Sequence, residues 1–353
     1  LGFSHEDEVS WRVRDSPRSS KEEVHYETVK KPPRNRGLLS FWKWAETPSD
    51  IELKQIAGME GCEMRGFVEL QDGRKLEFID NDIKSEKAIV LHHGSPMEML
   101  YFEGLVDSLA ARGVRAIAYT RPGYGESTRL PNRNVIDNNS DLATILAHQN
   151  IAQFVSFGWS AGGPPALAST LLENCRGASI VATPAPFDRP DLDGFAGMTD
   201  AFTAECRACS SSVDSSFAFK QAHIDDVKAL TPELLLSVFS NRDASAKYET
   251  EYKTMAHDLS KSLMRAIDPD TIGFAEDDHS WLKPWGFDIE AIDRPVQMWI
   301  GSHDEYIPVA HAEWFGNHVR AVDLHILEGQ DHVSIMVEHF DQILDSAISL
   351  LQG

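Results

Sequence analysis

The chain has 353 residues and a formal net charge of -22, and 42% of its residues are hydrophobic. A chain of this length can bury a large core, so we expect one large α/β domain with an insertion, or two domains. The acidic surface argues against nucleic acid and anionic membranes as partners, because both would repel it. We expect a small molecule as the partner, and the sequence leaves both a monomer and a homodimer open.

The four cysteines are too few in so long a chain for a disulfide framework, which indicates a reducing compartment. Cys206 and Cys209 form a C-x-x-C motif, but no second pair accompanies them, so we predict no metal site and no cofactor. No run approaches the ~18 apolar residues of a membrane span, and the first residues lack a basic and then apolar signal. We therefore expect a cytoplasmic location.

The N-terminal segment combines many charged residues with serines and prolines over residues 1–36. Such a composition cannot bury enough apolar surface to offset the entropy lost on ordering. We predict an N-terminal tail or arm over residues 1–45, partly disordered. Its short aromatic stretch Leu38–Trp44 is interpreted as packing of the arm onto its own domain, with a partner or membrane surface as the alternative.

Period-two alternation begins at Met64 and predicts a hairpin of strands 64–70 and 75–79, with Asp72-Gly73 at the turn. The short apolar run 87–92 is typical of a strand buried on both faces of a parallel sheet. Strands and helices then alternate, which predicts a doubly wound, mostly parallel sheet. The further predicted elements are a helix at 101–112, a strand at 114–119, a helix at 141–148 and a strand at 178–182.

This alternation stops near residue 184, and the pattern is mostly helical up to residue 285, including 232–239 and 248–267. Long connections in compact domains are usually functional, so we interpret 185–285 as a helical lid inserted after the sixth of eight strands. The core would then consist of residues 46–184 and 286–353. Its second part is predicted to contain strands 296–300 and 322–327, a helix at 311–318 and a long helix at 333–351.

One stretch carries the clearest chemical signal. An apolar segment from Phe154 leads into Gly158-Trp159-Ser160-Ala161-Gly162, and a helix-forming segment follows. A serine at the tip of a sharp strand-to-helix turn exposes its hydroxyl and requires small neighbours on both sides. The helix that follows directs free N–H groups and its positive end toward an oxyanion beside the serine. The pattern predicts Ser160 as a nucleophile.

A serine hydroxyl needs a base, for which imidazole is best suited, and a carboxylate must fix the tautomer of that imidazole. Asp304 lies four residues beyond the predicted strand 296–300, and His332 lies between the last strand and the last helix. Both positions fall in loops after strands, where a parallel sheet places its site. The alternative for Asp304 is an N-cap of the helix that starts near Pro308.

The order Ser160, Asp304, His332 is that of nucleophile, acid and histidine in the α/β-hydrolase family, and the chain resembles its lidded, single-domain members. The resemblance covers residues 64–183 and 286–351. It implies a Ser-Asp-His triad on an α/β-hydrolase fold. Some members place the acid after the sixth strand, at the position of Asp188, but the prolines around Asp188 favour a role in the lid hinge.

The segment His92-His93-Gly94-Ser95-Pro96 resembles the H-G-x-P loop of the family. The resemblance implies that the backbone N–H groups of Ser95 and Ala161 form the oxyanion hole. The supporting motif residues would be His93, Gly94, Pro96, Gly158 and Gly162. The loop that begins with Arg121-Pro122-Gly123 also resembles the family and is assigned a structural role.

The resemblance implies a serine hydrolase that cleaves a small, apolar carboxylic ester, as carboxylesterases do. Serine at the strand-to-helix turn argues against the dehalogenases and epoxide hydrolases, whose nucleophile at this turn is aspartate. Amide, lactone, thioester and carbon–carbon bond cleavage use the same triad and stay open. Further alternatives are acyl transfer or cofactor-free haloperoxidase-like activity, a proline-iminopeptidase-like amide hydrolase, and a non-catalytic receptor for a small ligand.

Two groups of residues in and near the predicted lid have two interpretations each. The acidic runs Asp225-Asp226 and Glu276-Asp277-Asp278 offer partners for a substrate amine, although solvated helix ends are the simpler interpretation. Apolar side chains near the nucleophile line either a pocket or the core. These candidate pocket residues are Trp159, Met97, Trp281 and Trp285.

Overall fold

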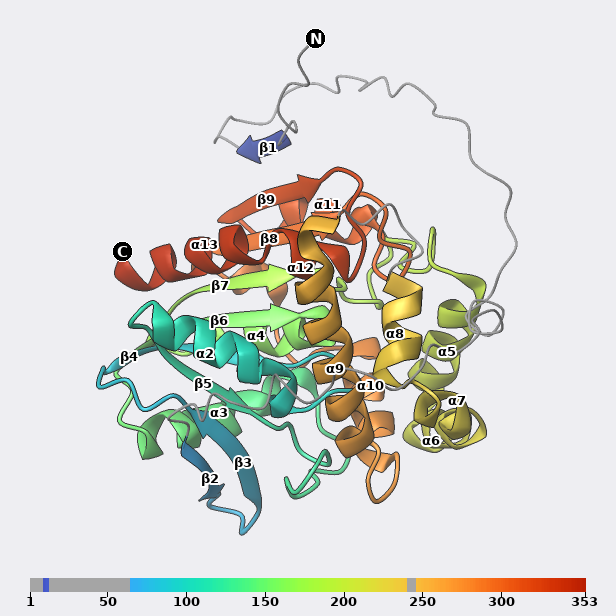
Figure 1. Cartoon of the computed structure of the whole chain (residues 1–353), viewed down its shortest axis with the longest axis horizontal. Coiled ribbons are helices and arrows are strands. Elements are labelled where there is room, and N and C mark those ends of the chain that lie inside the picture. The colour runs from blue at the N-terminus through green and yellow to red at the C-terminus, as the bar shows by residue number, and fades with distance from the viewer. Residues whose placement is uncertain (1–8, 13–63, 240–245) are drawn as a thin grey trace.

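The computed structural model describes residues 9–12, 64–239 and 246–353. Within these residues nine strands form one sheet in the order β1-β9-β8-β7-β6-β4-β5-β3-β2 (Figure 1). The strands from β4 to β9 pair in parallel, whereas β2, β3 and β1 pair antiparallel to their neighbours. The bounds are β1 Val9–Arg12, β2 Met64–Glu69, β3 Lys75–Asp80, β4 Lys87–His92, β5 Arg115–Tyr119, β6 Gln153–Trp159, β7 Cys175–Val181, β8 Val296–Gly301 and β9 Val322–Leu327.

The predicted eight-stranded, mostly parallel sheet is confirmed by β2 to β9, in the strand order of an α/β-hydrolase fold. The ninth strand, β1, comes from the segment predicted to be a tail and pairs antiparallel with the edge strand β9. The aromatic stretch Leu38–Trp44 and Cys62 lie outside the described residues. No helix within the described ranges combines the length and hydropathy of a membrane span.

The hairpin β2–β3 shows how the local sequence sets the register at the other edge of the sheet. Gly73 adopts φ +85°, a left-handed conformation that glycine tolerates and side chains resist. The N–H of Leu70 donates to the carbonyl of Arg74 at 2.7 Å and closes the turn. From the second residue onward β3 is buried, so the alternating pattern gives way to full burial where the hairpin joins β5.

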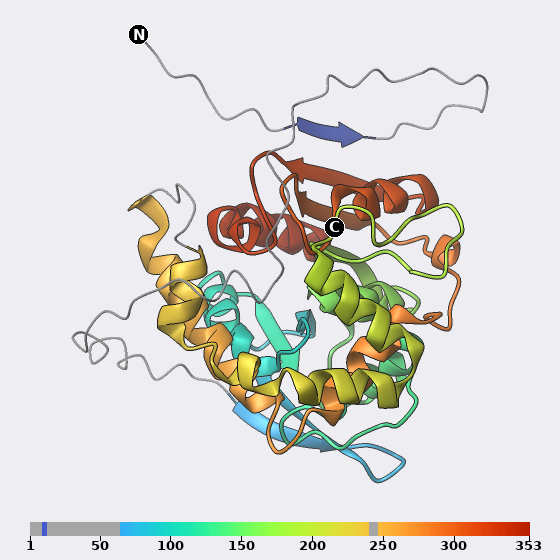
Figure 2. The same cartoon turned by 90° about the vertical axis from the view of Figure 1, so that its right-hand side faces the viewer.

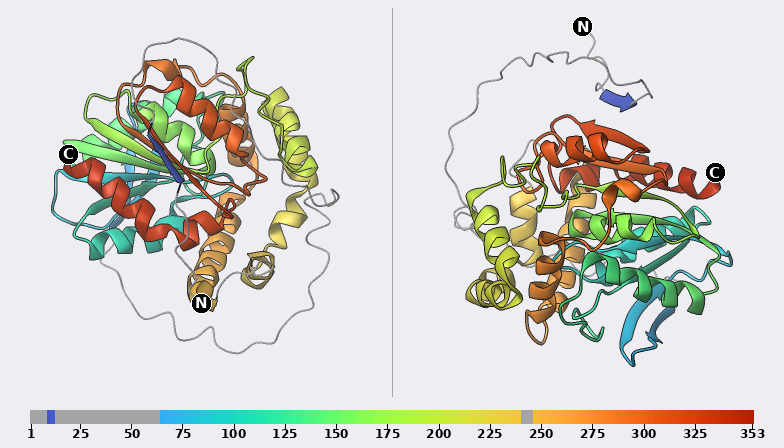
Figure 3. Two further views of the ribbon diagram at one scale, coloured as in Figure 1. Left: turned by 90° about the horizontal axis from the view of Figure 1, so that it is seen from above. Right: turned by 180° about the vertical axis from the view of Figure 1, so that it is seen from behind.

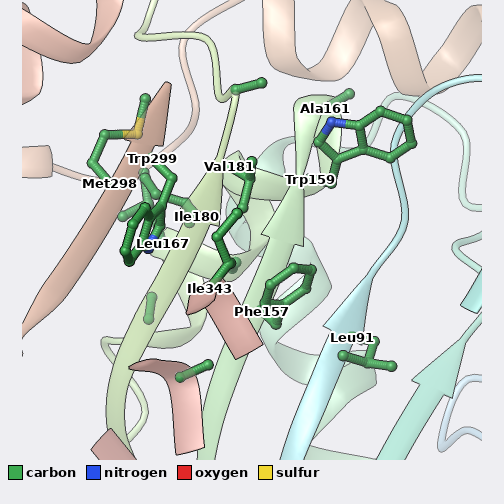
Figure 4. Close-up of a cluster of buried hydrophobic side chains, with 14 of the residues drawn as sticks. Leu91, Phe157, Trp159, Ala161, Leu167, Ile180, Val181, Met298, Trp299 and Ile343 are labelled. Carbon is green, nitrogen blue, oxygen red and sulfur yellow. The ribbon is translucent and has the colours of Figure 1, made fainter. Parts of the chain in front are cut away.

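Helices cover both faces of the sheet, as the strand–helix alternation predicts (Figures 1 and 3). α2 and α13 pack on one face, and α3, α4 and α11 pack on the other. Side chains such as Leu91, Phe157 and Ile180 are therefore enclosed between layers (Figure 4). Each such side chain contributes about 1.5–3 kcal/mol on burial. The bounds are α2 Glu103–Ala111, α3 Asn138–His148, α4 Gly163–Ser169, α11 Val309–His318 and α13 Phe340–Gln352.

Among the described residues, six α-helices lie between β7 and β8, and we refer to them as the insert helices. They lie at the end of the sheet to which the arrowheads of β6 and β7 point, and Figure 2 views them from that end. The helices predicted at 232–239 and 248–267 correspond to α8 and α9. The bounds are α5 Asp200–Ser211, α6 Val213–Ala222, α7 Ile224–Lys228, α8 Pro232–Phe239, α9 Glu249–Ala266 and α10 Ile272–Leu282.

The predicted single helix at 333–351 is wrong in one respect, because the chain breaks it at His339. α12 spans Ser334–Glu338 and α13 begins at Phe340. α12 packs against α9, whereas α13 packs against the sheet. One straight helix cannot make both contacts, so the tertiary packing overrides a continuous helical pattern.

Candidate active site

Ser160 lies at the turn between β6 and α4, with φ +55°. A non-glycine residue in this left-handed region stores strain, and such strain is typical of functional sites. The neighbouring glycines are required by close packing. A Cβ on Gly158 would lie 2.7 Å from the carbonyl carbon of Gly162, and one on Gly162 would lie 2.7 Å from the carbonyl oxygen of His93. The G-x-S-x-G spacing thus lets the turn pack against the end of β4.

Asp304 and His332 meet in the loops after β8 and β9. The imidazole Nδ1 of His332 lies 2.8 Å from Oδ2 of Asp304, which is 5% exposed. The other carboxylate oxygen, Oδ1, accepts the backbone N–H groups of Tyr306 at 2.9 Å and Ile307 at 2.8 Å. Asp304 is not the N-cap of α11, since that position is Pro308. The carboxylate is instead oriented toward the imidazole, which leaves Nε2 of His332 as the proton acceptor.

The loop of His332 is tied directly to the turn that carries Ser160. Trp159, the residue before Ser160, donates its indole N–H to the carbonyl of His332 at 3.1 Å. The imidazole contacts the rings of both Trp159 and Tyr306, with centroid distances of 5.6 and 5.3 Å. The loop after β4 also reaches Ser160, because a Cβ on Gly94 would lie 3.4 Å from the Cβ of Ser160. The loops after β4, β6, β8 and β9 therefore meet around Ser160.

His93 supports the H-G-S-P loop from within the core. Its Nε2 accepts the backbone N–H of Arg121 at 3.0 Å, so Nδ1 carries the proton and donates to the carbonyl of Gly94 at 2.7 Å. Burial, together with the nearby Arg121, lowers the pKa of His93 well below its ordinary value. His93 is thus a neutral, fixed donor and not a second base.

The interpretation of Glu276-Asp277-Asp278 as solvated helix ends is wrong. All three acids lie on α10 and are buried, and cations from the core loop 121–133 and from α6 compensate their charges, whereas Asp225 and Asp226 on α7 are exposed. The ion pairs join Glu276 to Arg129 at 2.7 Å, Asp277 to Arg121 at 2.5 Å and to Arg133 at 2.6 Å, and Asp278 to Lys220 at 2.5 Å.

The contacts of Arg121 and Asp277 therefore go beyond what the sequence pattern predicted, which was a structural loop for Arg121 and an acidic run for Asp277. Burial alone would raise the pKa of Asp277, but Arg121 and Arg133 hold it below its ordinary value. One signal for this burial was present in the sequence. The acids follow Phe274-Ala275 and precede Trp281-Leu282, and a helix with apolar residues on both sides of an acidic run is typical of an enclosed position.

The candidate pocket residues Trp159, Met97, Trp281 and Trp285 are all buried in one hydrophobic cluster. Trp159 stacks on Tyr101 with a centroid distance of 5.1 Å. The terminal methyl of Met97 packs against Gly94, so closely that a Cβ on residue 94 would clash with it. Trp281 donates its indole N–H to Asp278 at 3.1 Å, and Trp285 donates to the carbonyl of Trp281 at 2.9 Å. Packing thus accounts for all four, and Trp159 and Met97 also adjoin the residues around Ser160.

Glu98, next to the H-G-S-P loop, is a buried carboxyl with no hydrogen bond to either oxygen within the described residues. Its Oε2 lies 3.5 Å from Nε of Arg265, which already pairs with Glu77 at 2.6 Å. Burial raises the pKa of Glu98 to about 7. Between about pH 5 and pH 7 the folded chain holds a proton that the unfolded chain has released, so stability rises as the pH falls through this range.

We therefore expect Glu98→Gln to raise the free energy of unfolding by about 3 kcal/mol at pH 8 and to leave it nearly unchanged at pH 5. The reason is that glutamine removes the buried charge, which is present only above pH 7. Urea unfolding at both pH values measures the effect, with the exposed Glu69→Gln as the control. Equal effects of Glu98→Gln at the two pH values would contradict the prediction.

The family model described as the alpha/beta hydrolase fold matches residues 87–345. The chain therefore belongs to the alpha/beta hydrolase family. A non-heme haloperoxidase of Rhodococcus erythropolis is 32% identical over 98 residues, or 28% of this chain and 35% of that protein. This chain thus matches about a third of the length of that relative.

Two further comparisons extend over most of the chain. A protein named as a putative non-heme chloroperoxidase of Synechocystis is 23% identical over 295 residues, which cover 80% of this chain and 97% of that protein. The solved structure of an esterase from Exiguobacterium antarcticum superposes with a TM-score of 0.56 at 17% identity, covering 82% of this chain and all of that one. At this identity the likeness to the esterase establishes the fold.

Proposed function

We propose that this chain is a serine hydrolase that cleaves a small carboxylic ester through an acyl-enzyme at Ser160. The observation that carries the proposal is the 2.8 Å hydrogen bond between His332 and the buried Asp304, on loops tied to the strained turn of Ser160. A serine hydroxyl, an imidazole and an oriented carboxylate together form the unit that activates a nucleophile.

In this mechanism Nε2 of His332 accepts the proton of Ser160 while Oγ attacks the ester carbonyl carbon. The backbone N–H groups of Ser95 and Ala161 bind the oxyanion that forms. The tetrahedral intermediate then breaks its bond to the alcohol oxygen, which takes the proton from His332. Water enters and gives a proton to His332 as it attacks the acyl-enzyme, and the second collapse returns the proton to Ser160 and releases the carboxylic acid.

The segment 185–285, which contains the insert helices, is proposed as a lid beneath which the substrate binds. Trp159 and Met97 adjoin the residues around Ser160 with apolar surface, which favours an apolar acyl or alcohol group. An amine-binding function like that of a proline iminopeptidase is less favoured, because each acid of the run 276–278 already has a cation. Serine in place of aspartate at the strand-to-helix turn likewise disfavours the opening of epoxides.

A second candidate is peroxide-dependent acyl transfer, which the names of the two peroxidase relatives favour. Here hydrogen peroxide replaces water, so the acyl-enzyme yields a peracid and free Ser160. The peracid then oxidises a halide and is itself reduced to the carboxylic acid. Bromination of a dye acceptor in the presence of peroxide, bromide and a carboxylic ester measures this activity, and Ser160→Ala must abolish it together with ester hydrolysis.

We expect a fluorophosphonate probe to label Ser160 alone in the native protein and to leave His332→Ala unlabelled, because only an activated hydroxyl attacks the phosphorus centre. Peptide mass spectrometry locates the modified residue. The control is His339→Ala, because the ring of His339 contacts Gln342, whereas the ring of His332 contacts Asp304. An unlabelled, folded and monodisperse protein would reject the hydrolase and favour a ligand receptor of the same fold.

A further inference from the structure

The peptide between Gly94 and Ser95 is held in one orientation. Its carbonyl oxygen, on Gly94, accepts Nδ1–H of His93 at 2.7 Å and an N–H of Arg121 at 3.0 Å. A trans peptide is planar, so its N–H points opposite to its carbonyl. The two donors on the Gly94 carbonyl therefore also determine where the N–H of Ser95 points. That N–H is one of the two proposed oxyanion donors.

Arg121 owes its position to Asp277 of α10. The guanidinium is 1% exposed and faces the carboxylate with two hydrogen bonds, Nε to Oδ1 at 3.0 Å and Nη2 to Oδ2 at 2.5 Å. Its Nη1 donates to the carbonyl of His93. A planar guanidinium whose nitrogens all donate to fixed acceptors in this way has a single allowed orientation. Arg133 also donates to Asp277 at 2.6 Å and holds the carboxylate in place.

The side chain of Ser95 is held from the same helix by a separate contact. Its hydroxyl donates to Oδ1 of Asp278 at 2.6 Å. Asp278 is itself fixed, because Lys220 donates to Oδ2 at 2.5 Å and Trp281 donates to Oδ1 at 3.1 Å. Two consecutive acids of one insert helix thus control both the peptide and the side chain of one residue.

We propose that Asp277 and Asp278 are positioning residues for the oxyanion hole, and that α10 must be docked for the N–H of Ser95 to face the substrate oxygen. This inference rests on the proposed function. Asp277 acts through Arg121 and the Gly94 carbonyl, and Asp278 acts through the Ser95 hydroxyl. A donor that points away from the oxyanion leaves the transition state less stable while the ground-state complex is little affected.

Glu276 provides a matched control within the same run of acids. It is as buried as its two neighbours and joins α10 to the same core loop through Arg129. Its contacts do not extend to residues 93–95 among the hydrogen bonds of the described chain. Weaker docking of α10 would lower kcat in Glu276→Gln as well as in Asp277→Asn, whereas loss of positioning would lower it only in Asp277→Asn.

The first experiment measures kcat and KM for p-nitrophenyl butyrate. We expect Asp277→Asn to lower kcat about 100-fold with KM within about threefold, as removal of one oxyanion donor does. We expect Glu276→Gln to keep both parameters within about threefold of the native enzyme. Equal losses of kcat in the two variants would overturn the proposal.

A second readout does not depend on activity. The Nδ1–H of His93 reports the orientation of the Gly94 carbonyl, and its proton resonance is observable in protein labelled with [15N]histidine and assigned with His93→Asn. We expect this resonance to persist in Glu276→Gln and to shift or vanish in Asp277→Asn. An unchanged resonance in Asp277→Asn would overturn the hold of α10 on the loop. A native protein that neither labels nor hydrolyses would instead reject the proposed function.

Asp277→Asn leaves two buried guanidinium groups without a carboxylate, so a variant that keeps every buried charge paired tests the second contact. Ser95→Ala removes a hydroxyl that donates to Asp278 and also lies 2.9 Å from the hydroxyl of Tyr124. We expect it to lower kcat about tenfold at unchanged KM, and Ser95→Thr, which restores a hydroxyl, to recover most of that loss. A Ser95→Ala enzyme with native kcat would refute the role of Asp278.

Discussion

The Asp304→Asn variant is expected to lose about 10,000-fold in kcat and to stay folded. Asparagine keeps the oxygen that accepts the N–H groups of Tyr306 and Ile307. Its amide, however, presents N–H donors to Nδ1 of His332, where the native carboxylate accepts at 2.8 Å. Nδ1 must then become the acceptor, which moves the proton to Nε2. An imidazole protonated at Nε2 cannot accept the proton of Ser160.

Steady-state hydrolysis of p-nitrophenyl butyrate measures this loss, and urea unfolding establishes that the fold is intact. Asp331→Asn is the matched control, because Asp331 precedes His332 and accepts the N–H groups of Val333 and Ser334 through one carboxylate oxygen. Asparagine can replace it there, so we expect kcat within about threefold of native. Similar losses in both variants would mean that general loop disorder, and not the tautomer, lowers the activity.

Local pattern was enough to predict most of the core. The hairpin at 64–80 follows from alternation and an Asp-Gly turn, and β4 from a continuous apolar run, because these signals are read within a few residues. The break between α12 and α13 was not predictable in this way. It depends on α9, which lies some seventy residues earlier in the chain.

The candidate triad was predicted from chain order and family resemblance, with the strand ends as the supporting context. The contact that joins its parts, Trp159 to His332, pairs residues 173 positions apart, and no local pattern contains it. The same holds for Arg121 and Asp277, which lie 156 positions apart. The sequence shows an acidic run but not the cations that pair with it. Only the tertiary structure therefore distinguishes a buried ion pair from a solvated helix end.

Gly162→Ala is expected to lower both stability and activity. Gly162 has φ -78° and ψ -17°, which alanine adopts freely, so backbone strain is not the cause. The added Cβ would instead meet the backbone of β4, 2.7 Å from the carbonyl oxygen of His93 and closer to that of His92. Because main-chain atoms cannot rotate aside, we expect a loss of about 3 kcal/mol in the free energy of unfolding.

The control for this loss is Gly316→Ala in α11, where the nearest atom to a Cβ is 3.7 Å away and helix propensity favours alanine by about 1 kcal/mol. Urea midpoints should fall for Gly162→Ala and hold or rise for Gly316→Ala. Activity must fall with Gly162→Ala even where the variant is folded, because relief of the clash moves the turn of Ser160 away from β4 and the loop of His93. A folded Gly162→Ala enzyme with native kcat would show that the contact between the turn and β4 does not set the position of the nucleophile.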